Sequence, residues 1–263
     1  MMNLVTKKSH FTVFLAICLM GLIALAGCEE TEQNLVNGNG SENIENPVAD
    51  ITENQSTQIN NEMNLPRLEG KATVVMTVKG QPITIELDGN NAPITAGNFV
   101  DLVQQGVYDG LVFHRVVTEP QPFVAQGGDP QGKDPNFPVN RLGTGGYTDP
   151  QTNSQRYIPL EIRPQYNDSD ENVTPPDIVY SQTTDQTPQL RHEYGVIAMA
   201  RSQMPDSASS QFYFTLADLP FLDGSYAVFG RVTDGMDVVE SIAQGDRIDS
   251  AKVIDGVENL KTN

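Results

Sequence analysis

The most regular stretch of the chain reads Phe113-His114-Arg115-Val116-Val117, then Phe123-Val124-Ala125-Gln126-Gly127-Gly128-Asp129. The first part holds Phe113, Val116 and Val117, and the second begins with Phe123 and Val124; aromatic and β-branched residues of this kind favour strands. The polar residues Arg115 and Gln126 lie among apolar neighbours in these two parts. The stretch therefore predicts two short strands, over residues 111–117 and 123–126, that each carry a polar side chain.

The same strand pattern extends outward over most of the chain from about Lys71. Ile83, Ile85 and Leu87 alternate with other residues, which places them on one face of a strand. Lys79-Gly80-Gln81-Pro82, just before them, predicts a hairpin turn. Further strands are predicted over residues 73–78, 83–87, 196–200, 211–216, 227–232 and 252–254.

Two segments have helical character instead. Pro93 suits the first turn of a helix, with Phe99 and Leu102 on its buried face and Gly106 at its end. A second helix is predicted over residues 236–243. Many short strands with only two helices indicate a mainly β fold (all-β in class). A closed antiparallel barrel is the expected architecture, since closure leaves no exposed strand edge.

Composition and charge exclude several classes of protein. The 263 residues include 16 Lys and Arg against 34 Asp and Glu, a formal charge of −18. That balance argues against a nucleic-acid partner, because phosphate binding needs clustered basic side chains. Two cysteines are too few for a disulfide-dense scaffold or a zinc ribbon. The three histidines lie far apart, and common catalytic motifs are missing, so we expect no metal and no organic cofactor.

The N-terminus has the features of an export signal. Lys7 and Lys8 precede an almost continuous apolar run over residues 11–26, which ends in Leu25-Ala26-Gly27-Cys28. This ending resembles the bacterial lipobox, in which the cysteine is diacylated and becomes the first residue of the mature chain. The resemblance implies a signal peptide over residues 1–27 and lipidation of Cys28. The alternative is an uncleaved transmembrane helix.

A polar segment separates this signal from the strand-rich part. Residues 29–66 hold eight acidic residues and no Lys or Arg. The segment has too few apolar side chains to form a core. We expect a lipidated, disordered tether over residues 28–68 and a domain over 69–263; the alternative is a recognition tail. Residues 129–194 are poorly patterned, which indicates a functional surface or an insertion.

Six segments in register resemble the cyclophilin family of peptidyl-prolyl cis-trans isomerases, from about Ala72 to the C-terminus. Besides the two quoted first, they are Gly143-Thr144-Gly145-Gly146, Gly195–Ala200, Ser210–Phe214 and Phe221–Gly230. The resemblance implies an eight-stranded antiparallel barrel capped by two helices. It also implies catalysis of the cis-trans exchange of X–Pro bonds.

Within this resemblance, Arg115 matches the catalytic arginine and Gln126 the glutamine that bonds substrate backbone and helps place the arginine. A fixed cation can stabilise the twisted amide, whose pyramidal nitrogen exists only in the transition state. The alternatives are a surface arginine in an ion pair and a glutamine that closes a loop. His114 is expected to be structural, buried and bonded to backbone.

The resemblance also assigns residues to substrate binding. The expected proline pocket is lined by Phe123, Val124, Tyr213 and Leu222, and further contacts come from Gly143, Ala200, Arg201, Ser202, Gln211, Phe221 and Tyr226. For Phe123 and Tyr213 the alternative is ordinary core, and Phe212 and Phe214 are expected to be core. The chain departs from common family residues at Val124, Arg201, Tyr213, Phe221 and Tyr226.

The combined expectation is a monomeric isomerase, lipid-anchored at Cys28 to a membrane of a bacterial envelope and facing the extracytoplasmic side. Its substrates would be proline-containing, newly exported polypeptides. A non-catalytic binding module and a general holdase are the alternatives. The loops over residues 118–122 and 151–192 look enlarged relative to the family and flank the expected groove.

Overall fold

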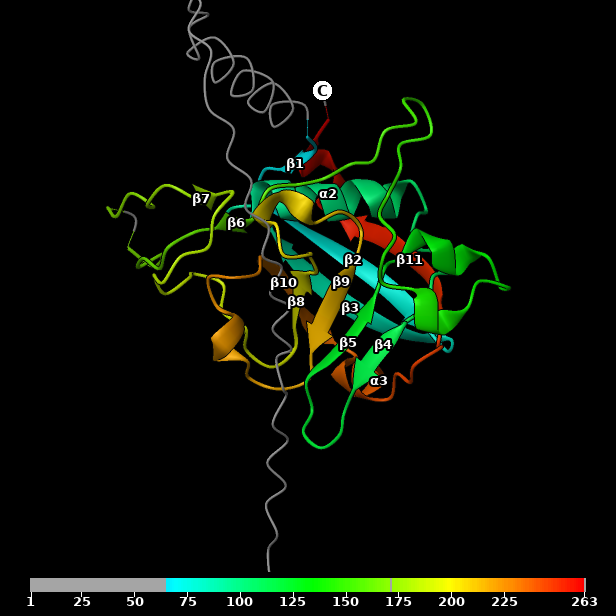
Figure 1. Ribbon diagram of the computed structural model, residues 1–263. Coiled ribbons are helices and arrows are strands. Elements are labelled where there is room, and N and C mark those ends of the chain that lie inside the picture. Colours follow the sequence, from blue (N-terminus) through cyan, green and yellow to red (C-terminus); the bar gives the residue numbers. More distant parts are fainter. Residues whose placement is uncertain (1–64, 171, 263) are drawn as a thin grey trace, which may run out of the picture. The chain divides into compact units, whose positions relative to one another are not determined.

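An eight-stranded antiparallel sheet forms the body of the protein (Figure 1). The computed structural model describes residues 65–170 and 172–262; the expected signal peptide, Cys28 and most of the tether lie outside them. The strands follow one another in the sheet in the order β11-β2-β3-β10-β8-β9-β5-β4. Their bounds are β2 Lys71–Val78, β3 Gln81–Asp88, β4 Arg115–Val117, β5 Val124–Gly127, β8 Val196–Met199, β9 Phe212–Thr215, β10 Val228–Asp234 and β11 Ile248–Asp255.

Two α-helices lie at opposite ends of this curled sheet (Figure 1). They are α2 (Pro93–Gln104) and α3 (Met236–Glu240), so the mainly β class and the two expected helices are confirmed for the described residues. Two small antiparallel sheets pair β1 (Arg67–Leu68) with β12 (Leu260–Lys261), and β6 (Glu161–Ile162) with β7 (Val179–Tyr180). Short 3₁₀ turns are η1 Pro130–Lys133, η2 Val139–Arg141, η3 Pro205–Ser207, η4 Pro220–Leu222 and η5 Val257–Asn259.

The hairpin of β2 and β3 shows how local sequence sets this sheet. Lys79 and Gly80 make the turn, with φ of 53° and 72°. Positive φ at both central residues matches the twist of a two-residue hairpin, and pairing resumes at once between Val78 and Gln81. The turn is therefore shorter than the predicted four-residue segment. Ile83 and the other alternate residues of β3 are fully buried, as predicted.

Alternation in β9 divides the apolar residues between two sides of the sheet. Phe212 and Phe214 are fully buried in the main core, where they pack with Phe99 of α2 and other aromatic rings. Tyr213, between them, belongs to a second apolar cluster on the other side of the sheet, together with Val124. Because successive side chains point to opposite faces, one strand supplies both the core and the surface behind it.

The expected closed barrel is wrong. The edge strands β4 and β11 do not pair as a ladder in the described structure, and the sheet is an open, curled half-barrel. Among the described residues, a single isolated bridge, between Val112 and Arg247, connects the segments that precede β4 and β11. The chain just before β4 takes the place of a strand, since Phe113 N–H bonds Asp246 O and Ile248 N–H bonds Leu111 O. These irregular bonds pair backbone N–H and C=O groups at the edge of the sheet without a continuous ladder.

Other differences concern element ends. The predicted strand over residues 111–117 is a strand only from Arg115, because residues 110–113 bond in the irregular pattern just described. The second helix ends at Glu240 rather than residue 243, and the last strand begins at Ile248 rather than residue 252. At the other end of the domain, β1 pairs with β12 and Leu68 is fully buried, so folded structure includes this part of the expected tether.

The segment over residues 151–192, which is expected from the sequence to be enlarged, is attached to the N-terminus of α2 through Glu161. Ala92, the residue before the helix, has no capping side chain, and Pro93 has no N–H to satisfy. Glu161, only 1% exposed, accepts instead from the N–H groups of Ile94 and Thr95, at 3.1 and 2.8 Å. A carboxylate from this distant segment thus replaces the local helix cap.

Among the described residues, no helix has both the length and the apolar character needed to cross a lipid bilayer.

Replacement of Glu161 by alanine is expected to lower the free energy of unfolding by about 1–3 kcal/mol, because two buried N–H groups lose their acceptor. Burial raises the pKa of Glu161 above its ordinary 4.5, against the lowering effect of the Thr95 and Ile94 N–H groups. Ionisation is therefore disfavoured in the folded state, and the loss should be larger below pH 4.5 than at neutral pH.

Urea unfolding at the two pH values measures this effect. The matched control is Lys71→Ala, which removes an exposed ion pair with Glu86 and should change stability by less than about 1 kcal/mol. Equal stability of Glu161→Ala and the unmodified protein would contradict the capping role of Glu161.

Candidate active site

The second apolar cluster forms the floor of a pocket on the outer side of the curled sheet. Val124 of β5, Ala198 of β8 and Tyr213 of β9 are all buried in it. These strands are neighbours in the sheet, and Gln126 lies opposite Tyr213 in the β5–β9 register. The floor is therefore built from residues that alternate with core residues along the same strands.

A pocket of about 250 Å³ lies over this floor. It brings together most of the residues expected from the sequence, although they come from four separate parts of the chain. Its lining consists of Arg115, Phe123, Val124, Gln126, Ala200, Arg201, Tyr213, Leu222 and Tyr226. The apolar members form the base and walls, while two arginines and one glutamine supply polar groups.

Arg115 and Gln126 face each other across the β4–β5 pair. The guanidinium Nη1 of Arg115 donates to Gln126 Oε1 at 3.3 Å, and its central carbon lies 5.3 Å from the centroid of the Phe123 ring. None of the ion pairs found within residues 65–170 and 172–262 includes Arg115. The alternative of a surface arginine in an ion pair is therefore not what the described structure contains.

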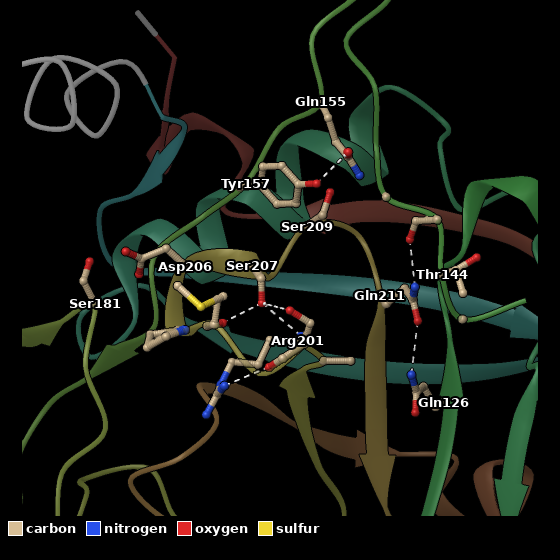
Figure 2. A pocket seen from close by; sticks show the side chains of 17 residues that line it. Gln126, Thr144, Gln155, Tyr157, Ser181, Arg201, Asp206, Ser207, Ser209 and Gln211 are labelled. Carbon is tan, nitrogen blue, oxygen red and sulfur yellow. Dashed lines mark hydrogen bonds between the residues drawn. The ribbon is translucent and has the colours of Figure 1, made fainter. Parts of the chain in front are cut away.

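A chain of amide side chains holds Gln126 in turn. Gln126 Nε2 donates to Gln211 Oε1 at 3.1 Å, and Gln211 Nε2 donates to Gly145 O at 2.7 Å. Figure 2 shows Gln126 and Gln211 in line, with both bonds drawn. This chain fixes which end of the Gln126 amide points at Arg115, because its nitrogen is engaged by Gln211.

Phe221 lies at the rim rather than in the lining. Its ring stacks on that of Phe123, with centroids 6.1 Å apart and planes 13° from parallel. It is 69% exposed, which leaves an apolar face open beside the pocket. Phe123 is only partly buried, so it is a wall residue and not core.

A larger pocket of about 600 Å³ adjoins the first and shares Gln126, Ala200 and Arg201 with it (Figure 2). The expected residues Gly143, Ser202 and Gln211 line this second pocket. Thr144, Gly145 and Gly146, from the segment quoted for the resemblance, also line it, although only Gly143 was expected to contact substrate. The residues that sequence reasoning missed are Gln155, Tyr157, Ser181, Met204, Pro205, Asp206, Ser207 and Ser209. These missed residues lie in loops without periodicity, so no sequence pattern grouped them.

Arg201 separates the two pockets and is held in place on several sides. Its Nε donates to Ser225 O at 2.8 Å, and its Nη1 donates to Ser202 O at 2.9 Å. The guanidinium carbon lies 4.8 Å from the centroid of the Tyr226 ring. The site therefore contains a second fixed cation besides Arg115, where the family commonly has a neutral residue.

Asp129 fixes the loop that forms one wall of the larger pocket. It is 1% exposed, and its Oδ2 accepts from the N–H groups of Gly143 and Gly145 at 2.6 and 3.0 Å. Gly143 has φ of 102°, and a Cβ there would lie 3.3 Å from His114 Nε2. Sequence reasoning did not select Asp129, although its place after Gly127-Gly128 was a signal.

His114 is buried, as expected, and the Val112 backbone lies close enough to raise its pKa, but no bond to backbone has full hydrogen-bond geometry. Neither ring nitrogen has a hydrogen-bond partner in the part of the chain that the structure describes. Burial lowers the pKa of His114, against the raising effect of nearby Asp129. His114 is therefore neutral at neutral pH and acts in this site as a packing residue against Gly143.

No group of three or more His, Cys, Asp or Glu side chains within residues 65–170 and 172–262 is arranged to hold a metal ion.

Asp129→Ala is expected to speed amide hydrogen exchange at Gly143 and Gly145 by at least about tenfold, because each loses its charged acceptor. Hydrogen-exchange NMR on the folded variant measures this. Asp134→Ala is the matched control, since exposed Asp134 makes a similar turn with Asn136 and lines neither pocket. Unchanged exchange at both glycines in Asp129→Ala would refute the assigned role.

Comparison with known proteins places the chain among related sequences. The family model described as "Cyclophilin type peptidyl-prolyl cis-trans isomerase/CLD" matches residues 73–261. A putative thylakoid lumen peptidyl-prolyl cis-trans isomerase of Synechocystis is 42% identical over 212 residues, covering 75% of this chain and 50% of the relative. A chloroplastic peptidyl-prolyl cis-trans isomerase of Arabidopsis thaliana is 37% identical over 220 residues, covering 75% and 45%.

A probable peptidyl-prolyl cis-trans isomerase of Brucella suis is 33% identical over 183 residues, covering 69% of this chain and 76% of the relative. The chain spans about half the length of the Synechocystis and Arabidopsis relatives. Solved cyclophilins of Cryptosporidium parvum and Hirschia baltica share the fold, each with a TM-score of 0.50, at 23% and 22% identity. The match to the Cryptosporidium structure covers 70% of this chain and 97% of that protein. The match to the Hirschia structure covers 76% of this chain and 80% of that protein.

Proposed function

Because the chain belongs to the cyclophilin-type peptidyl-prolyl cis-trans isomerase family, we propose that it accelerates cis-trans exchange of X–Pro bonds in polypeptides. The observation that carries this proposal is the convergence of Arg115, Gln126 and Phe123 on one apolar pocket. All three are expected from the sequence. Arg115 and Gln126 supply the polar groups of the site, and Phe123 supplies an apolar wall for the proline ring.

The reaction requires a shaped and polarised site rather than a nucleophile. Rotation about a peptide bond has a barrier of about 18–20 kcal/mol, because the C–N bond has double-bond character. In the twisted amide this conjugation is lost, and the prolyl nitrogen becomes a hydrogen-bond acceptor. A donor placed at that nitrogen stabilises the transition state more than either ground state, which lowers the barrier.

Arg115 is the proposed donor. Its guanidinium stays charged and offers several N–H groups in a rigid plane. One of these is engaged by Gln126 Oε1, and Gln126 is itself held by Gln211. The orientation of the cation therefore exists before substrate binds, so little reorganisation is needed during the reaction.

The apolar floor and walls would hold the proline ring. Phe123, Val124, Tyr213 and Leu222 line the smaller pocket with Arg115 at its edge. A ring seated there would place its nitrogen toward the cation. Residues on the N-terminal side of the proline would extend along Ala200 and Ser202, with Gly143 and Gln211, into the larger pocket. Phe221 and Tyr226 would contact the substrate at the rim.

The competing function is a non-catalytic module that uses the same groove to hold a partner. Such a groove would need apolar walls, but it would not need an arginine oriented by two successive amides. The chain Arg115–Gln126–Gln211 favours catalysis over simple retention. A holdase role would likewise place no demand on Arg115.

Arg115→Ala is expected to lower kcat/KM for a proline-containing tetrapeptide by about 100-fold to 1,000-fold, because one transition-state donor is lost. Arg115 is exposed, so stability should change by less than about 1 kcal/mol. A protease-coupled isomerase assay and urea unfolding measure the two effects.

Arg141→Ala is the matched control, because Arg141 also lies over an aromatic ring, Phe137, yet lines neither pocket. Its turnover should equal that of the unmodified protein. Unchanged turnover in Arg115→Ala would rule out the proposed mechanism, and suppression of aggregation by that variant would point to the holdase instead.

We also propose that the protein works outside the cytoplasm, lipid-anchored at Cys28 through the acidic tether. The lipobox-like ending of the apolar run supports the anchor. The name of the Synechocystis relative places that protein in the thylakoid lumen, also a compartment outside the cytoplasm. Proline-containing, newly exported chains are the proposed substrates, and the protein is proposed to act as a monomer.

Cys28→Ala is expected to abolish incorporation of a labelled fatty acid such as palmitate and to shift the protein from the membrane to the soluble fraction. The chain has one other cysteine, Cys18, inside the expected signal peptide. Cys18→Ala should therefore keep both the label and the membrane location. Labelling of Cys28→Ala at the unmodified level would reject the anchor.

A further inference from the structure

A buried histidine lies directly behind the floor of the smaller pocket. The side chain of His192 is 0% exposed. Its Nε2 lies 3.0 Å from the hydroxyl oxygen of Tyr213, and its Nδ1 lies 2.9 Å from Asp223 Oδ1. The ring stacks on Tyr213, with centroids 6.2 Å apart and planes 17° from parallel. The pocket floor is thus linked by side chains to a carboxylate on another part of the chain.

The backbone of His192 contacts the same region twice more. Its N–H donates to Asp223 Oδ1 at 2.8 Å, and its C=O accepts from the N–H of Leu219 at 2.7 Å. Residues 219 and 223 flank the turn η4, which carries Leu222 into the pocket wall. His192 is therefore the point where the floor and one wall of the pocket are joined.

The direction of the hydrogen bonds follows from the chemistry of the partners. An ionised carboxylate only accepts, so His192 Nδ1 donates to Asp223, and Nε2 is left as the acceptor. Tyr213 must then donate its phenol proton to Nε2. Burial raises the pKa of Tyr213, which keeps this proton in place. Burial also lowers the pKa of His192 below its ordinary 6.5, against the raising effect of Asp223.

We propose that His192 is a positioning residue for the proline pocket. It bonds the floor residue Tyr213 on one side and Asp223 on the other, and so keeps the floor in place against the wall formed by Leu222. This inference rests on the proposed function, since it concerns how the same pocket binds proline. Tyrosine at position 213 departs from the phenylalanine common in the family, and the bond to His192 is what its hydroxyl adds.

The arrangement also predicts a response to acid. A protonated His192 donates from both nitrogens, so the Tyr213 phenol would lose the acceptor that it now has. Other charged or titratable groups around His192 are Arg191, which donates to Asp223 Oδ2 at 3.3 Å, and the exposed neighbour Glu193. On the floor side, Tyr226 and Arg201 face Tyr213. The bond would then run from His192 Nε2–H to the Tyr213 oxygen and would leave the phenol proton without its acceptor in the pocket floor. Acidification should therefore weaken proline binding.

Tyr213→Phe tests the inference, because it keeps the ring and removes only the bond to His192. At neutral pH, the Kd and KM for a proline tetrapeptide should rise about threefold to tenfold, the equivalent of one hydrogen bond. The kcat should stay within about threefold, since Arg115 does not contact His192. His192→Gln should show the same split, and NMR titration with exchange spectroscopy on the full chain gives all three constants.

The pH profile provides the second readout. In the unmodified protein, Kd should rise as the pH falls below 6.5, because the pKa of His192 is lowered from that value. The rise should follow the ¹⁵N shifts of His192, which should show the Nδ1–H form at neutral pH. The rise should vanish in Tyr213→Phe and His192→Gln. It should persist in His114→Asn, the matched control, because His114 lies at the other pocket, beside Gly143.

The outcomes are distinct. Wild-type Kd and KM in Tyr213→Phe at neutral pH would overturn the positioning role, whether or not His192→Gln folds. An acid-dependent rise that persists in Tyr213→Phe, or that vanishes in His114→Asn, would overturn it as well. Proline binding that follows the predicted pattern in a protein without any isomerase turnover would refute the proposed function and leave the role of His192 standing.

Discussion

The period-two alternation of side chains in β5, β8 and β9 is the constraint on which the rest of the structure depends. Phe212 and Phe214 point into the main core, while Tyr213 between them faces outward. A one-residue slip of β9 would exchange these sides and destroy the core and the pocket together. The stability of the fold and the shape of the site are therefore two consequences of one register.

The site adds a cation to this apolar surface without burying it. Arg115 is exposed, so it keeps its hydration and charge, yet its direction is restricted by Gln126 and by the face of Phe123. Neutral amides perform this restriction. A carboxylate in their place would neutralise the cation where positive charge is useful. Gln211, another neutral amide, holds Gln126 in turn and extends this chain of hydrogen bonds into the larger pocket.

Irregular segments complete what the strands begin. The sheet stays open, and the backbone around Phe113 bonds its far edge in place of a strand. The segment over residues 151–192 caps α2 through Glu161, and Asp129 shapes the loop of the larger pocket. In each case a buried polar group is satisfied by a residue distant in the chain, which joins the loops to the scaffold.

Sequence reasoning by itself identified the mainly β class, eight short strands, and the pairing of Arg115 with an apolar pocket, because these follow from local periodicity and from motifs in register. It overestimated closure, since strand edges show no local signal of how they meet. Tertiary structure alone joined His192 to Tyr213 and Asp223, which lie 21 and 31 residues away. It also added the side chains of unpatterned loops, such as Gln155 and Tyr157, to the expected residues of the larger pocket. Such contacts depend on the path of the whole chain, because the separation of residues in sequence does not fix their distance in space.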